Sequence, residues 1–183
     1  PREGKTLTAT NLALTLSESY GLKVLLVDAD LRRPSVHEIF KLPNTAGLSD
    51  GLRQDKGQMQ LVEVSPCLTV LPAGRSTSDP MALLTSERMK SLVREAAARY
   101  DWVILDTPPI LAVTDAAIIA RLAGVTLLVI RAGQHPLREI TLALKRFTQS
   151  GVKPAGLVFN DVVRRATNAA YHYQYDYRKD EAK

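Results

Sequence analysis

The sequence predicts an α/β fold in which a mostly parallel β-sheet is covered by helices on both faces. Short, continuously apolar runs of strand length occur at residues 24–27, 102–105, 125–130 and 156–159. Segments with helical periodicity separate these runs along the chain. Strands that are apolar throughout are typical of a sheet buried on both faces, and their alternation with helices is typical of parallel pairing.

A helix is expected from residue 6 to residue 20, because apolar residues recur there at helical spacing. Gly21 then stands where a C-terminal helix cap belongs. The run at residues 24–27 follows directly and ends abruptly in aspartates. The residues predicted to face the core from this helix are Ala9, Leu12, Ala13 and Leu16.

The rest of the chain continues the alternation. Residues 30–60 contain several prolines and glycines, so we expect short helices and loops over one end of the sheet. A further strand is expected at residues 68–71, and helices at residues 81–99, 114–122 and 136–150. The residues predicted to face the core from the first and last of these helices are Leu84, Leu92, Val93, Ala96, Leu137, Ile140, Thr141, Leu144 and Phe147.

The composition indicates one globular domain. Of the 183 residues, 45% are hydrophobic and 23% charged, which excludes general disorder. The net charge of +5 does not distinguish nucleic acid, a phosphate-bearing ligand or a membrane surface as a partner. The single cysteine, Cys67, is expected to be a buried small hydrophobic residue of a protein from a reducing cytosol. No run approaches the ~20 apolar residues of a membrane-spanning helix, and no signal-peptide pattern is present.

Gly4, Lys5 and Thr6 form the second half of a phosphate-binding loop, GxxxxGK[S/T], and a predicted helix follows them. In such a loop backbone amides surround the phosphates, the lysine reaches the outer two and the hydroxyl binds Mg²⁺. The triplet alone is weak evidence, because a lysine on a solvated helical turn produces the same letters. Phosphate-binding loops follow a buried strand, so we expect one core strand upstream of Pro1.

Acidic residues stand at the ends of two predicted strands. Asp28 and Asp30 follow the first run, and Asp106 follows the run at residues 102–105. Ligands of open parallel sheets bind beyond the carboxyl ends of the strands, and carboxylates there hold Mg²⁺ through its water shell. Either acidic end alone is equally well explained by turns and caps. Together with the loop, they predict a site for ATP and Mg²⁺.

Three segments resemble the Walker A, Walker A′ and Walker B motifs of bacterial tyrosine kinases. They are PREGKT at residues 1–6, LLVDADLRRP at 25–34 and VILDTPP at 103–109, and VIRAG at 129–133 and GLVFN at 156–160 extend the resemblance. It implies a P-loop NTPase fold and an ATP- and Mg²⁺-dependent protein-tyrosine autokinase. Such kinases form the cytoplasmic domain of polysaccharide co-polymerases that control capsule and exopolysaccharide export. An N-terminal part before Pro1 is expected to place the domain at the inner membrane.

The resemblance also implies residue roles and partners. The catalytic residues would be Lys5, Asp28, Asp30 and Asp106, with Asp28 as the base, and the metal would lie among Thr6, Asp28, Asp30 and Asp106. The implied nucleotide-binding residues are Pro1, Arg2, Glu3, Gly4, Lys5, Thr6, Leu7, Arg131 and Asn160, the last at the adenine. The implied partners are ATP or ADP, further copies of the chain in a ring and a membrane-spanning activator, without nucleic acid.

A tail at residues 164–183 is predicted to follow a kinase domain at residues 1–163. Four of the six tyrosines alternate with other residues in this tail. Alternation also suits an edge strand, and aromatic residues among basic ones also suit stacking on single-stranded nucleic acid. The segment has no aliphatic partners, however, and similar clusters are autophosphorylated in the kinase family. The resemblance therefore implies phosphoacceptors at Tyr171, Tyr173, Tyr175 and Tyr177, with transfer between subunits.

Two other functions stay open. A partitioning ATPase of the ParA and MinD type would share the fold, but such proteins usually have glycines where Pro1 and Arg2 stand and have no tyrosine tail. A non-enzymatic module would use ATP only to set the assembly of an export machine. Arg32 and Arg33 are interpreted as solvated surface charge. We infer no metal site from the histidines, which lack ligand spacing and stand at His37, His135 and His172.

Overall fold

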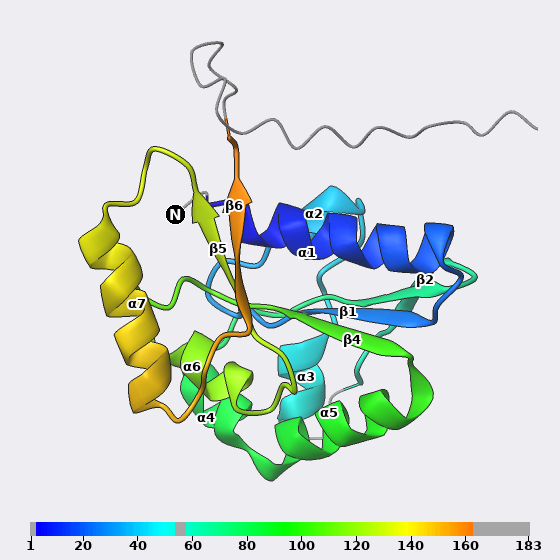
Figure 1. Ribbon diagram of the computed structural model, residues 1–183. Helices are drawn as coiled ribbons and strands as arrows, with labels where there is room; N and C mark the ends of the chain where they lie inside the picture. The colour runs from blue at the N-terminus through cyan, green and yellow to red at the C-terminus, as the bar shows by residue number, and fades with distance from the viewer. Residues whose placement is uncertain (1–2, 54–57, 163–183) are drawn as a thin grey trace, which may run out of the picture.

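The computed structural model describes residues 3–53 and 58–162 (Figure 1). Pro1, Arg2 and the predicted tyrosine acceptors lie outside the described residues. The strands are β1 (Val24–Asp28), β2 (Val62–Ser65), β3 (Leu68–Leu71), β4 (Trp102–Asp106), β5 (Leu127–Arg131) and β6 (Gly156–Asn160). One sheet has the order β2-β3-β1-β4, and β5 and β6 form a second, parallel pair.

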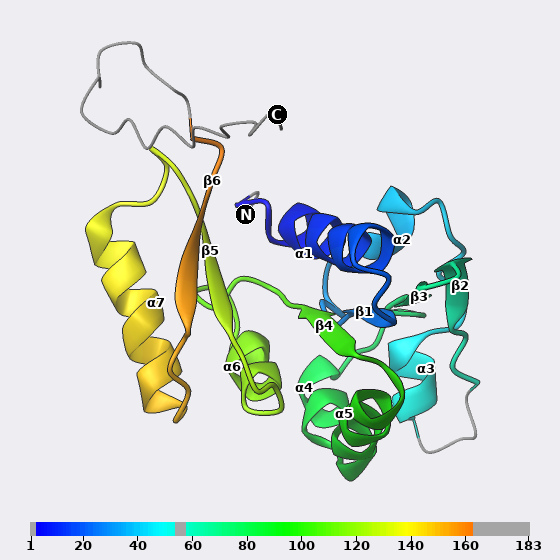
Figure 2. The ribbon, with the colours of Figure 1, turned by 45° about the vertical axis from the view of Figure 1, so that its right-hand side comes forward.

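Helices cover the sheets as the sequence predicts. They are α1 (Lys5–Leu14) with the π-helical turn η1 (Thr15–Ser19), α2 (Val36–Ile39), α3 (Leu48–Leu52), α4 (Pro80–Thr85), α5 (Glu87–Arg99), α6 (Asp115–Ala120) and α7 (Leu137–Gln149). Figures 1 and 2 show α1 and α2 on one side of the four-stranded sheet, with α3 and α5 on the other. The helix α7 lies alongside β5 and β6. The predicted α/β fold is confirmed. No helix in the described ranges is long and apolar enough to cross a membrane.

The strand β1 lies at the centre of the core and brings two acidic strand ends together. All five of its residues are buried. It pairs in parallel with β3 on one side and with β4 on the other, and the register places Asp28 opposite Asp106. Parallel strands end at the same edge of a sheet, so both carboxylates lie where the chain turns from strand to loop.

The strands β4, β5 and β6 are less buried than their apolar sequences predict. Trp102 on β4 and Phe159 on β6 are 46% and 59% exposed. Within the described residues, β4 forms one edge of its sheet and β5 pairs only with β6, so the strands do not form one continuous sheet. The expectation of burial on both faces is therefore correct for β1 and wrong for these three strands.

The structure corrects two predicted segments. The helix expected at residues 81–99 is two helices, because Ser86 has an extended backbone and its Oγ accepts the Met89 amide, which starts α5. The strand β2 was not predicted. It pairs with β3 in antiparallel fashion at the edge of the sheet, and its sequence, VEVS, alternates apolar and polar residues instead of forming an apolar run.

Smaller corrections concern which side chains reach the core. Gly21 has the expected left-handed backbone, with φ of 65°, at the end of the first helical segment. The buried side of that segment is formed by Thr10, Ala13 and Ser17, so the predicted core residue Leu12 is exposed. Three predicted core residues of α7 are also exposed, namely Leu137, Thr141 and Leu144, and Cys67 is only half-buried.

Candidate nucleotide site

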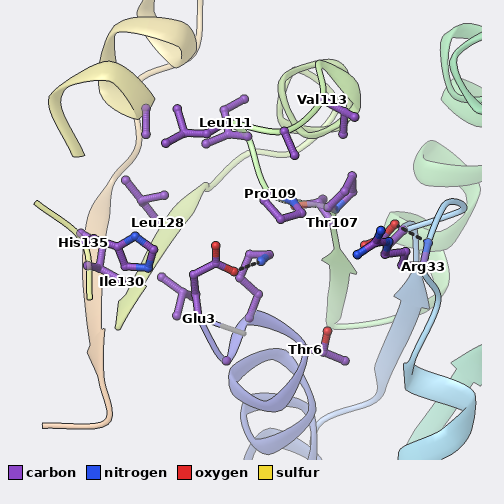
Figure 3. Close-up of a pocket in the computed structure, with 18 of the residues that line it drawn as sticks. Glu3, Thr6, Arg33, Thr107, Pro109, Leu111, Val113, Leu128, Ile130 and His135 are labelled. Carbon is purple, nitrogen blue, oxygen red and sulfur yellow. Dashed lines mark hydrogen bonds and ion pairs between the residues drawn. The ribbon is translucent and has the colours of Figure 1, made fainter. Parts of the chain in front are cut away.

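A cavity of about 900 Å³ lies beyond the carboxyl ends of β1 and β4. Figure 3 shows Glu3 and Thr6 on one side of it, Pro109 and Leu111 from the loop after β4, and His135 beside β5. The segments that line the cavity are residues 3–7, residues 30–35 in part, residues 107–113, residues 128–130 and part of residues 135–143. Its size and its position at the strand ends suit a nucleotide.

The residues before α1 form a tight loop that only glycine permits. Gly4 has a φ of 88°, and its carbonyl accepts the Thr8 amide at 2.8 Å, which begins α1. A Cβ on Gly4 would lie 2.0 Å from the Asn160 Nδ2. That Nδ2 donates to the Glu3 carbonyl oxygen at 3.0 Å. The structure therefore brings Asn160 to the phosphate-loop backbone, at the end of β6.

Lys5 is already paired with a carboxylate of the same loop. Its Nζ lies 2.5 Å from the Glu3 Oε2, and both side chains are mostly shielded from solvent. Burial raises the pKa of Glu3, but the hydrogen bond and charge of Lys5 outweigh burial and lower the pKa to about 2. Glu3 is thus an anion bound to the Lys5 ammonium, the group that the sequence predicts to bind phosphate.

Asp28 and Asp106 form a buried acidic pair. Their residues are 0% and 4% exposed. Burial, together with the nearby charge of Asp106, raises the pKa of Asp28 to about 7, although hydrogen bonds from three backbone amides act in the opposite direction. Burial also raises the pKa of Asp106 to about 6, against the hydrogen bond from Thr6 and the charge of Lys5, which lower it. Two buried carboxylates side by side repel each other, and a bound cation would relieve this repulsion.

The loop after β1 is folded around its two aspartates. The Asp28 Oδ1 accepts the Asp30 amide at 3.2 Å, and its Oδ2 accepts the amides of Ser35 and Val36, each at 3.0 Å. The Asp30 Oδ1 accepts the amides of Arg32 and Arg33. The Ser35 hydroxyl donates to the Thr6 Oγ1 at 3.3 Å, which links this loop to α1.

The donor atoms fit a hard divalent cation that keeps part of its water shell. Thr6 and Asp30 line the cavity, and Asp106 lies behind them in contact with Thr6. Among the residues that the structure describes, no group of three or more His, Cys, Asp or Glu side chains is placed to hold a metal ion. Hydroxyl and carboxylate oxygens that leave several positions for water and phosphate are typical of Mg²⁺ sites.

Not every predicted residue reaches the cavity. Arg131 is absent from the lining, and its Nη2 lies 2.6 Å from the Asp161 carboxylate instead. Arg32 is exposed as expected, but the prediction missed that its guanidinium also pairs with the buried Asp115. The sequence also gave no sign of Ser35 as a neighbour of Thr6, since a serine that bonds across 29 positions has no local pattern.

The comparisons with known proteins agree with this geometry. A family model described as an AAA domain matches residues 3–149. The chain is 40% identical to the tyrosine-protein kinase wzc of Salmonella typhimurium, over 98% of this chain and 26% of the relative. It is 41% identical to the tyrosine-protein kinase ptk of Acinetobacter johnsonii, over 90% of this chain and 22% of the relative. The chain thus spans about a quarter of the length of these curated relatives.

Solved structures distinguish the kinases from the wider fold. The kinase domain of the Escherichia coli tyrosine kinase ETK has a TM-score of 0.85 and 38% identity, covering 96% of this chain and 69% of that one. The cell division ATPase MinD of Pyrococcus furiosus has a TM-score of 0.69 at 20% identity, covering 87% of this chain and 67% of that one, which shows a shared fold alone. The chain therefore belongs to the AAA-domain family and, within it, to the bacterial tyrosine kinases of the Wzc and Etk type.

Proposed function

We propose that this chain transfers the γ-phosphoryl group of ATP to tyrosine hydroxyl groups. The observation that carries the proposal is the convergence of Lys5 and Thr6 with the acidic ends of β1 and β4 at one cavity. Phosphoryl transfer depends mainly on alignment and on charge neutralisation, which this arrangement supplies. The kinase relatives named above support tyrosine as the acceptor.

In the proposed reaction the tyrosine oxygen attacks the γ-phosphorus, the bond between that phosphorus and the bridging oxygen breaks, and ADP leaves. The hydroxyl proton passes to Asp28, whose pKa of about 7 suits a base at neutral pH. Asp28 is fully buried, so the loop at residues 29–35 has to shift to admit the acceptor. Lys5 and the loop amides bind the phosphate oxygens.

The proposed metal is Mg²⁺, with Thr6, Asp30 and Asp106 as the side chains that would hold it and Asp28 beside them. When bound, Mg²⁺ neutralises charge on the β- and γ-phosphate oxygens. The relevant contribution of the chain is to hold hard oxygen atoms at the carboxyl ends of two paired strands, where the phosphates of a nucleotide at Lys5 would lie.

The proposed acceptors are Tyr171, Tyr173, Tyr175 and Tyr177, which lie outside the described residues. We propose transfer between copies of the chain in a ring-like assembly, since a tail reaches a neighbouring site more readily than its own. We further propose that the domain acts at the cytoplasmic face of the bacterial inner membrane, with a membrane-spanning activator. Its task there would be the regulation of capsule or exopolysaccharide export, as the kinase relatives suggest.

Two variants test the reaction. Lys5→Met removes the phosphate lysine and keeps the tail, whereas a variant with phenylalanine at the four tail positions keeps the site and removes the acceptors. The parent incubated with Mg·ATP should gain phosphotyrosine, detected by mass spectrometry, and each variant alone should gain none at the tail. A mixture of both variants should again carry phosphotyrosine, on the Lys5→Met chains. Phosphorylation of the parent without any in the mixture would show transfer within one chain.

The same samples separate the alternatives. A parent that gains no phosphotyrosine contradicts the kinase proposal. Hydrolysis of ATP that DNA stimulates would then favour a partitioning ATPase. A change in assembly with ATP, without hydrolysis or phosphotyrosine, would favour the non-enzymatic module.

A further inference from the structure

Arg32 and Asp115 form a two-pronged ion pair at the edge of the site. The Arg32 Nε donates to the Asp115 Oδ2 at 2.7 Å, and its Nη2 donates to the Oδ1 at 3.2 Å. Asp115 is 1% exposed, whereas the Arg32 side chain is 41% exposed and also lines the cavity. Two parallel bonds from a planar guanidinium to a carboxylate fix orientation as well as distance.

The two residues belong to the two loops that leave the acidic strand ends. Arg32 lies two residues after Asp30, and its amide bonds the Asp30 Oδ1 at 3.2 Å, so its backbone shapes the position of that carboxylate. Asp115 begins α6, at the end of the loop that follows Asp106. The pairing of β1 with β4 ends with Asp28 and Asp106, and one further backbone bond joins the Ala29 amide to the Asp106 carbonyl.

Beyond Ala29 and Asp106, hydrogen bonds between the two strands no longer hold the loops that follow β1 and β4 beside each other. The Arg32–Asp115 pair joins them again past the end of the sheet. Asp30, whose carboxylate lines the cavity, lies between these two attachments. Attachments on both sides of a carboxylate that binds a metal fix the orientation of that carboxylate, although the attached residues do not contact the metal themselves.

We infer that Arg32 and Asp115 are positioning residues, which hold Asp30 against the Asp106 side of the site and so set its affinity for the divalent cation. The inference rests on the proposed function for the identity of that cation. It is tested through nucleotide binding, so it holds or fails independently of whether the chain phosphorylates tyrosine.

The test uses a single and a double variant. Arg32→Ala leaves Asp115 buried without its partner, so the melting temperature should fall. Arg32→Ala combined with Asp115→Asn removes the buried charge as well, so the melting temperature should largely recover. The Mg²⁺ requirement, which reports how well Asp30 is positioned, should not recover. The double variant should bind ADP without Mg²⁺ within about twofold of the parent, but require about tenfold more Mg²⁺ to tighten that binding.

Arg32→Lys adds a graded measurement. It keeps the charge and loses the two-pronged geometry, so its Mg²⁺ requirement should lie between those of the parent and the double variant. A matched control is Arg75→Ala. Arg75 Nε lies 2.6 Å from Asp50, an equally buried carboxylate, and neither residue lines the cavity. This control should lower the melting temperature without changing the Mg²⁺ requirement.

Two outcomes would overturn the inference. If the Mg²⁺ requirement of the double variant returns to the parent value together with the melting temperature, the pair is only structural. If the double variant loses affinity for ADP equally with and without Mg²⁺, Arg32 contacts the nucleotide directly. Both are read from ADP titrations by calorimetry, at several fixed Mg²⁺ concentrations.

Discussion

The Lys5 Nζ and the Glu3 Oε2 lie 2.5 Å apart, so the proposed phosphate-binding lysine is bound to a carboxylate two residues before it. Burial raises the pKa of Glu3, but hydrogen bonds and the charge of Lys5 together lower it to about 2, so this carboxylate is ionised at any physiological pH. A nucleotide that enters the loop must therefore replace one anion on Lys5 with another.

Replacing Glu3 with glutamine should tighten nucleotide binding. Glu3→Gln removes the competing charge, and we expect the Kd for ADP to fall about 3- to 10-fold, measured by calorimetry. Glu139→Gln is a suitable control, because Glu139 also lines the cavity but pairs with His135. Equal changes in both variants would indicate a general field effect. In a Lys5→Met background, Glu3→Gln should have little further effect, and a full effect there would contradict the explanation.

Removing the charge of Asp106 should stabilise the nucleotide-free protein. Burial raises the pKa of Asp106 to about 6, above the ~3.9 of an unfolded chain, so the folded state binds this proton more tightly. Ionisation of Asp106 therefore lowers the free energy of unfolding as pH rises from about 4 to 6. Asp106→Asn lacks this loss, and its advantage should grow over that range and reach about 1–3 kcal/mol at pH 7.

Thermal and denaturant unfolding from pH 4 to pH 8 check this second prediction. Mg·ADP should stabilise the parent and have little effect on Asp106→Asn, because the variant loses a proposed metal-site carboxylate. Asp161→Asn, which alters an exposed acid, serves as the control. A variant whose stability follows the parent curve across this pH range would show that Asp106 carries no electrostatic strain.

Asn160 should matter more for the phosphate loop than Arg131. The Asn160 Nδ2 donates to the Glu3 carbonyl oxygen, so Asn160→Ala should cost about 1 kcal/mol of stability and weaken ADP binding. Arg131 pairs with the half-exposed Asp161 outside the cavity lining, so Arg131→Ala should change ADP affinity less than about twofold. Calorimetric titration measures the ADP affinity of both variants. An equal loss in the two variants would restore Arg131 as a nucleotide-binding residue.

Phosphorylation of the tail should disperse an assembled form. Each phosphate adds about −1.5 to −2 charges, so four would add roughly −6 to −8. This negative charge should repel the acidic site and so weaken binding of the tail to it. Size-exclusion chromatography with light scattering compares the unmodified parent, the phosphorylated parent and the variant with four phenylalanines. If the fully phosphorylated parent assembles as the unmodified one does, charge on the tail is not the switch.

The fold was predictable where one local pattern carries it. The buried run before Asp28, the glycine at position 21 and the aspartate that ends β4 are all visible in the sequence, and the structure places each as expected. The break at Ser86 was also encoded, because serine is a favoured N-cap residue and Glu87 places a negative charge in the first turn, but the apolar periodicity on either side hid it. The exposure of β4 and β6 was not encoded locally, since it depends on which strands lie beside them.

Only part of the site was predictable from local sequence patterns. Lys5, Thr6 and the strand-end aspartates follow from motif spacing, and the structure brings them together. The partners that hold them did not follow. Asp115 pairs with a residue 83 positions away, and Asn160 bonds a carbonyl 157 positions away. Contacts between distant side chains leave no periodic mark on the sequence, so only the folded structure identifies them.

Trp102 gives the protein an internal optical probe. It is the single tryptophan of the sequence, it begins the edge strand β4, and nearly half of its surface meets solvent. The emission maximum of an indole shifts to shorter wavelength when water is excluded from it. The intrinsic fluorescence of the unlabelled chain will therefore report whether another segment or molecule covers this end of β4, without any dye or added label.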